Sequence, residues 1–262
     1  MPMRRLLKLL VSNGSGRRPK IITGFDPDWD GDDDSDPAFD PDHDGDEASI
    51  YFYDVIGGWD QPTTEEIVRG IRALGAKTIH LRINSPGGLV FEATAIKTAL
   101  EQHPAHVIAH VDGMAASAAS TLMLAGDEIE IAPGAFVMIH NPSSLAWGDA
   151  DEMRRCAEML DAIRDSIASQ YAARTGLSVE ELTAMMKAET WLSAEQAVEK
   201  KFVDRIAARA PQAANLRRFD LSAYDHPPKA LLAPPQPDPV AAYLKTSQER
   251  HARMLRLFER AA

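Results

Sequence analysis

The sequence contains a single cysteine, Cys156, among its 262 residues. One cysteine cannot form a disulfide within a chain and cannot by itself build a cysteine-based metal site. The sequence therefore excludes a disulfide-stabilised scaffold and a cysteine-based zinc site, and it suits a reducing compartment.

Long apolar runs and a surplus of basic residues are also missing. The basic start, MPMRRLLKLLV, has too short an apolar run for a signal-peptide core, and no later segment is apolar over a membrane-spanning length. The formal net charge is −11, whereas a nucleic-acid-binding face is normally basic. We expect a soluble, cytoplasmic protein whose partners include neither nucleic acid nor a membrane.

The negative charge is concentrated near the N-terminus. Residues 26–47 hold eleven Asp and one Glu without Lys or Arg. FDPDWDGD (25–32) recurs as FDPDHDGD (39–46), and each copy contains the start of a calcium loop. The twelfth loop position falls on Pro37 and Tyr51, where a calcium loop needs a bidentate Glu. We expect residues 1–47 to be a disordered segment, basic and then Asp-rich, with calcium binding as the alternative.

The next part of the chain, residues 48–208, has the pattern of a packed α/β domain. Apolar or alternating runs predict strands, and the amphipathic segments between them predict helices. The predicted strands are 48–56, 78–84, 105–111, 127–132 and 135–140, and the helices between them are 63–76, 88–103 and 115–126. Strands that alternate with helices predict a mostly parallel sheet with helical crossovers.

Helices dominate the rest of this domain. A long helix is predicted over 149–174, with a stop at Gly176, and two shorter helices begin at Ser178 and Ser193. The Pro- and Ala-rich composition of residues 209–262 predicts a linker that leads into a C-terminal amphipathic helix.

Two turns at strand ends contain small residues. INSPGG (83–88) ends a strand with a Pro and two glycines, and its free backbone N–H groups suit an anion or an oxyanion. One crossover later, a turn at residues 112–113 is expected to lead into a helix that carries Ser117 and Ser120. A serine on such a turn projects from the carboxyl end of the sheet. The alternative is that these small residues only allow tight helix packing.

A histidine ends the following strand. VMIHNP (137–142) places His140 at the carboxyl end of the strand, just before a proline that interrupts the strand pairing. The other seven histidines fall in peripheral segments, inside strands or beside a surface turn. His140 is therefore the best candidate for a general base, and a structural histidine is the alternative.

Together with ETWLSAEQAVEKKFVD (189–204), these motifs resemble the Clp protease proteolytic subunit in order and spacing. They are most similar to the Clp-like head maturation (prohead) proteases of tailed bacteriophages and prophages. The resemblance spans residues 50–206 and covers neither end of the chain. It implies an α/β, crotonase-like (ClpP-like) fold, a spiral of ββα units with a long oligomerisation helix, and the activity of a serine endopeptidase.

The resemblance also implies roles for single residues. The family nucleophile falls on Ser117, the general base on His140 and the third triad member on Glu189, where the Clp subunit usually has Asp. The oxyanion-hole positions fall on the backbone N–H groups of Gly88 and Ala118. No cofactor and no metal are expected.

Backbone geometry supports the choice between the two serines. Ser117 lies near the helix start, where the next N–H has no partner within the helix. Ser120 lies almost a turn deeper, so we expect it to be a small packing residue.

The resemblance further implies protein or peptide substrates, which would be capsid or scaffold proteins in the host cytoplasm or in the assembling prohead. An extended substrate would lie between residues 87–91 and 141–148. The helix at 149–174 is the candidate contact of a ring-forming homo-oligomer. We expect ATP-independent activity, although a Clp ATPase partner stays open, and we hypothesise that the enzyme trims its own ends.

Three other functions are alternatives. A crotonase-type acyl-CoA enzyme shares the fold but needs no serine nucleophile. Signal peptide peptidases of the Ser/Lys type usually carry a membrane anchor. A non-enzymatic capsid scaffold or ring protein would be favoured if a triad position were missing, and all three positions are occupied.

Overall fold

The computed structural model describes residues 10–11, 20–21, 46–58, 62–208, 219, 221 and 224–232. The chain divides into two compact units, residues 1–226 and 227–262. In the second unit, the structure describes one short helix, α7 (Lys229–Leu232). The Asp-rich repeat, apart from Asp46, and the expected C-terminal amphipathic helix lie outside the described residues.

A mostly parallel sheet forms the centre of the first unit. Its strands are β3 (Glu47–Phe52), β4 (Thr78–Ser85), β5 (His106–Ala116), β6 (Glu128–Ile131), β7 (Phe136–Ile139), β8 (Thr190–Ser193) and β9 (Arg205–Ile206). The order is β3-β4-β5-β6-β9, and β7 pairs with both β5 and β8. The β7–β8 pair is antiparallel and all other pairs in this sheet are parallel. A further antiparallel pair joins β1 (Leu10–Val11) to β2 (Lys20–Ile21).

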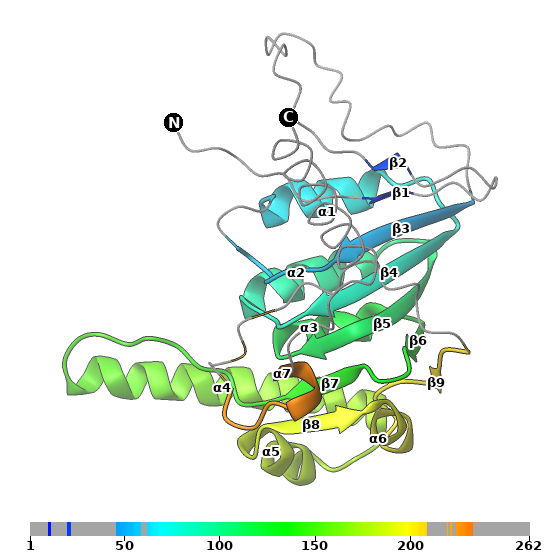
Figure 1. Cartoon of the computed structure of the whole chain (residues 1–262). Coiled ribbons are helices and arrows are strands. Elements are labelled where there is room, and N and C mark those ends of the chain that lie inside the picture. The colour runs from blue at the N-terminus through cyan, green and yellow to red at the C-terminus, as the bar shows by residue number, and fades with distance from the viewer. Residues whose placement is uncertain are drawn as a thin grey trace, which may run out of the picture. The chain divides into compact units, whose positions relative to one another are not determined.

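Helices cross over between the strands. They are α1 (Thr64–Ala73), α2 (Val90–Glu101), α3 (Ala118–Leu122) with the 3-10 turn η1 (Met123–Ala125), α4 (Ala150–Thr175), α5 (Val179–Lys187) and α6 (Ala194–Glu199). Helices α1, α2 and α3 lie along one side of the sheet, whereas α4 extends well beyond it (Figure 1). The predicted mostly parallel sheet with helical crossovers is confirmed.

Local sequence signals set the helix ends. Thr63 and Glu66 form a capping box at the start of α1, and Ser193 forms one with Gln196 on α6. Gly176 ends α4 with a φ of 77°, a left-handed conformation that glycine adopts without a steric penalty. These ends are specified by residues within one turn, so they are predictable without the tertiary fold.

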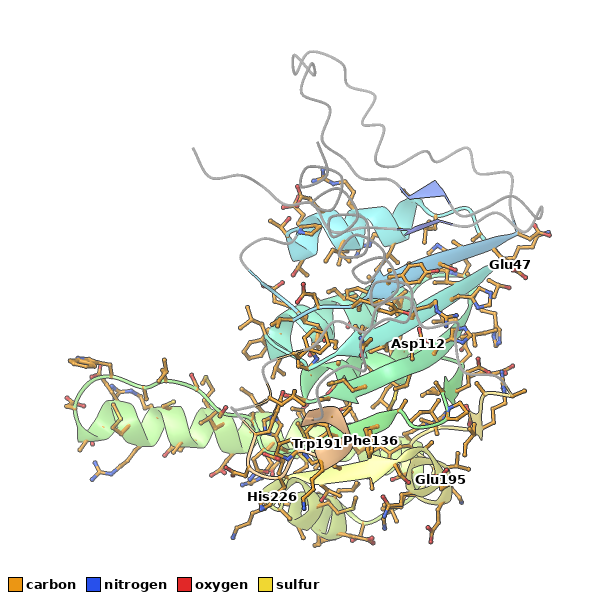
Figure 2. The ribbon with its side chains drawn as sticks, in the orientation of Figure 1. Glu47, Asp112, Phe136, Trp191, Glu195 and His226 are labelled. Carbon is orange, nitrogen blue, oxygen red and sulfur yellow. The ribbon has the colours of Figure 1, made fainter. Side chains whose placement is uncertain are left out.

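The two faces of the sheet differ in polarity. Along β4, Ile79, Leu81 and Ile83 are fully buried in the core under the helices. On the opposite face, Arg82 forms an ion pair with Asp112 on β5, with an Nη2 to Oδ1 distance of 2.5 Å. Figure 2 labels Asp112 on this sheet. This alternation follows from the two-residue period of a strand.

The end of β5 differs from the prediction. We expected the strand to stop at Val111 and to turn at residues 112–113, but β5 continues to Ala116. Its second half leaves β6 and pairs with β7, with Ala116 opposite Met138. The carboxylate of Asp112 also accepts a hydrogen bond from the Tyr53 hydroxyl, at 2.6 Å. These distant partners override the turn preference of an Asp-Gly pair.

Candidate active site

Ser117 lies at the sharp junction between β5 and α3. Its φ is 54° and its ψ is −126°, a conformation that costs a residue other than glycine on the order of 1–3 kcal/mol. The N–H of Ser117 donates a hydrogen bond of 2.9 Å to the carbonyl oxygen of Met138 on β7. The Ser117 side chain does not cap α3, so its hydroxyl is available to a partner outside the helix.

That partner is His140, the first residue after β7. Its Nε2 atom lies 2.7 Å from Ser117 Oγ. The parallel pairing of β5 with β7 brings the ends of the two strands together, which places the serine and the histidine side by side. Burial lowers the pKa of His140, and the negative charge of Glu189 opposes that shift. At neutral pH the imidazole is therefore neutral and can accept the serine proton.

The glycine turn of INSPGG packs directly against the serine. A Cβ atom built on Gly87 would lie 2.6 Å from the carbonyl oxygen of Ala116, 2.7 Å from Ser117 Cβ and 3.0 Å from the Ala118 nitrogen. Gly88 forms an isolated parallel bridge with Ile56. Only glycines permit so close an approach at φ angles of 98° and 146°. The turn that carries Gly88 thus meets the turn that carries Ala118.

Glu189 lies just before β8, with a φ of 49°. Its carboxylate accepts hydrogen bonds from Trp191 Nε1 (3.0 Å) and from the backbone N–H groups of Asp225 (2.8 Å) and His226 (2.7 Å). Figure 2 labels Trp191 and His226, two of these three donors. Burial acts to raise the pKa of Glu189, but the hydrogen bonds outweigh it and hold that pKa below its usual range.

The structure does not join Glu189 to His140 by a hydrogen bond within the part of the chain that it describes. The two side chains are near enough for each charge to shift the pKa of the other. Of the three residues that the resemblance assigns to a triad, the structure brings Ser117 and His140 into direct contact and leaves Glu189 bound to other donors.

A segment outside the recognised motifs also reaches this site. The ring of Tyr224 packs edge-on against His140, with 5.5 Å between ring centroids, and against Trp191, at 5.7 Å. The Tyr224 hydroxyl donates a hydrogen bond to the carbonyl oxygen of Pro86. Burial, and next the charge of Glu189, raises the pKa of Tyr224 to about 12. No catalytic motif marks this tyrosine, so only its tertiary contacts reveal it.

Ser120 has a different environment from Ser117. It is fully buried, and its hydroxyl donates a hydrogen bond of 2.6 Å to the carbonyl oxygen of Ser117. Its oxygen also lies 2.7 Å from the hydroxyl of Tyr171 on α4. Ser120 is more than a packing residue, because it ties the serine turn to the long helix.

Comparison with known proteins places the chain in one family. The Clp protease family model matches residues 48–210. The chain belongs to the Clp protease family. It is 35% identical over 140 residues to the ATP-dependent Clp protease proteolytic subunit 2 of Rhodococcus jostii (strain RHA1), covering 53% of this chain and 72% of the relative. It is 31% identical over 159 residues to proteolytic subunit 1 of Corynebacterium jeikeium (strain K411), covering 58% and 85%.

Membership of the Clp family confirms the expected Clp-like α/β fold and identifies the chain as a Clp-like serine protease. It favours peptide hydrolysis over the acyl-CoA chemistry and the purely structural role that were weighed above. In this family setting, the contact between Ser117 and His140 is the arrangement that a serine nucleophile and its base require.

Within residues 46–58, 62–208 and 224–232, no group of three or more His, Cys, Asp or Glu side chains could hold a metal ion. None of the helices in the described part of this Clp family chain is both long and apolar enough to cross a membrane.

Proposed function

We propose that this chain is a serine endopeptidase in which Ser117 is the nucleophile and His140 the general base. The observation that carries the proposal is the 2.7 Å contact between Ser117 Oγ and His140 Nε2. As Ser117 Oγ attacks the carbonyl carbon of a peptide bond, its proton moves to His140 Nε2. The protonated imidazole then gives that proton to the leaving amine, and water hydrolyses the acyl-enzyme by the same route.

The oxyanion of the tetrahedral intermediate would be stabilised by the N–H groups of Gly88 and Ala118. Ala118 is the first residue of α3, so its N–H has no partner within the helix. Contact between Gly87 and the Ser117–Ala118 turn supports the placement of both donors around one oxygen. One such donor lowers the barrier by about 3 kcal/mol.

Glu189 would act as the acid that orients His140. Its depressed pKa keeps it ionised at neutral pH, and its charge favours the imidazolium that forms during the reaction. The carboxylate already accepts three hydrogen bonds, which hold it in an orientation that makes no hydrogen bond to His140 within the described residues.

The substrate would bind as an extended strand between two flanks of the site. Leu89 and Phe91 on one flank are 55% and 69% exposed, and Leu145 and Trp147 on the other are almost fully exposed. Strand addition uses mainly backbone hydrogen bonds, and the exposed apolar side chains would supply the selectivity.

The likeness of the four motifs to head maturation proteases supports capsid or scaffold proteins as the substrates, in the cytoplasm of a bacterial host and inside the assembling prohead. The protease would also cleave bonds near its own two ends. Its reaction would need no ATPase partner. Co-expression with neighbouring capsid and scaffold proteins, followed by mass spectrometry of new termini, tests this role. New termini should appear with wild type and be absent with Ser117→Ala; identical termini with both would overturn it.

The long helix α4 would make the contacts of a homo-oligomeric ring. The buried residues of α4 lie in its second half, from Ile167 onward, whereas Met153 and Met159 in the first half are 37% and 44% exposed. Exposed apolar side chains on a helix that extends beyond the sheet (Figure 1) suit a contact with another copy of the chain. Native mass spectrometry should show an oligomer that Met153→Asp together with Met159→Asp dissociates, and an unchanged mass would contradict this contact.

A further inference from the structure

The segment of residues 224–226, named the strap from here on, contacts three parts of the active site at once. Backbone N–H groups of Asp225 and His226 donate to the carboxylate of Glu189 at 2.8 and 2.7 Å. The ring of Tyr224 lies against His140, and its hydroxyl bonds to the carbonyl oxygen of Pro86. The strap therefore touches the acid, the base and the edge of the glycine turn.

Each of these contacts competes with a step of peptide hydrolysis. The donors from the strap, together with Trp191, bond to both oxygens of Glu189 and so fix the orientation of its carboxylate; within the described chain no hydrogen bond links Glu189 to His140. The Pro86 carbonyl lies beside the two glycines, where an extended substrate would pair. Its oxygen accepts a hydrogen bond from the Tyr224 hydroxyl. A carbonyl oxygen can accept two hydrogen bonds, but the side chain of Tyr224 occupies one approach to the Pro86 oxygen, on the edge where the substrate strand would lie.

The strap is fixed in place on its N-terminal side. The N–H of Tyr224 donates a hydrogen bond of 3.0 Å to the carbonyl oxygen of Leu221. Leu221 is 3% exposed, which makes it a buried apolar anchor. The side chains of Asp225 and His226 are exposed, so the strap binds Glu189 through its backbone and leaves those side chains to solvent.

We propose that the strap is an autoinhibitory element, which holds the protease in a latent state until the strap leaves the site. In the latent state Glu189 is bonded to the strap in place of His140, and the substrate edge at Pro86 is closed. When the strap is displaced, the carboxylate is released to accept from the imidazole and the Pro86 carbonyl becomes available to substrate. This proposal rests on the serine peptidase function proposed above.

Variants of the full-length chain separate the contacts of the strap. Tyr224→Ala removes the ring and the hydroxyl, whereas Tyr224→Phe removes only the hydrogen bond to Pro86. Asp225→Pro removes one N–H donor to Glu189, and Asp225→Ala is the matched control because it keeps that N–H. Thermal melting of each variant establishes that it is folded. If Tyr224→Ala does not fold, the milder Tyr224→Phe still tests the contact with Pro86.

The readouts are peptide hydrolysis and the rate at which a fluorophosphonate labels Ser117. We expect kcat/KM and the labelling rate to rise at least about fivefold in Tyr224→Ala and Asp225→Pro, as the loss of one hydrogen bond predicts. Tyr224→Phe should show a smaller rise, and Asp225→Ala should match wild type.

Two results would overturn autoinhibition while leaving the peptidase intact. Unchanged rates in folded variants would mean that the strap does not restrain the site, and reduced rates would mean that it supports Glu189 for catalysis. If neither wild type nor any folded variant hydrolyses peptide or labels at Ser117, the proposed peptidase function fails, and the strap proposal fails with it.

Discussion

The hydroxyl of Ser120 donates a hydrogen bond of 2.6 Å to the carbonyl oxygen of Ser117. The same hydroxyl lies 2.7 Å from the hydroxyl of Tyr171, which is completely buried on α4. One serine of the GMAASAAS motif thus faces His140, and the other supports the strained turn on which the first serine lies.

Ser120→Ala is predicted to lower stability more than chemistry. The substitution removes the hydroxyl bond to the Ser117 carbonyl, which still accepts from the Ser120 N–H, and it removes the nearest partner of the buried Tyr171 hydroxyl. This loss costs about 1–3 kcal/mol. Urea denaturation should report this loss, while kcat falls by less than about tenfold because Ser120 does not touch His140. A loss of activity as complete as in Ser117→Ala, in a folded Ser120→Ala protein, would contradict this division of roles.

Gly87→Ala is predicted to disrupt the site through backbone contacts. The new Cβ would lie 2.6 Å from the carbonyl oxygen of Ala116, and the residue would keep a φ of 98°. Strain of this kind costs about 1–3 kcal/mol. If the turn moves to relieve the strain, it displaces the groups around Ser117, and kcat/KM should fall by more than about tenfold. Gly75→Ala is the matched control, because a Cβ at Gly75 meets nothing within 4 Å. Equal activity of the two variants would contradict the close packing of the glycine turn.

The pH dependence of hydrolysis is predicted from His140 and Glu189. Because burial lowers the pKa of His140, the acid limb of kcat/KM should lie below the ordinary histidine value of about 6.5. The charge of Glu189 raises that pKa, so Glu189→Gln should shift the limb to still lower pH as well as reduce the maximum rate. Glu195→Gln is the control, because the carboxylate of Glu195 bonds to Ser193 and does not act on His140. An acid limb that moves to higher pH in Glu189→Gln would contradict the assigned effect of Glu189 on His140.

The parts of the fold that could be predicted are those set by local signals. The capping boxes at Thr63 and Ser193 and the left-handed stop at Gly176 depend on residues within a single turn. The hydrophobic alternation of β4 likewise follows from its own sequence. Of the site, the order of the motifs pointed to Ser117 and His140, which the structure brings to 2.7 Å.

The parts that could not be predicted depend on contacts between distant segments. The extension of β5 past Asp112 arises because its second half pairs with β7, and β8 is a strand of four residues whose antiparallel pairing with β7 no local pattern signals. The contacts of Tyr224 with His140 and Pro86 join residues that are far apart in the sequence. Periodicity within one segment carries no information about such pairings.

Fluorophosphonate labelling of the full-length protein, followed by peptide mapping, tests the assignment of the nucleophile most directly. After prolonged incubation, wild type is predicted to carry one adduct, on Ser117, and the folded Ser117→Ala variant to carry none. An adduct that persists in Ser117→Ala, or folded wild-type protein that never reacts, would contradict the assignment of Ser117 as the nucleophile.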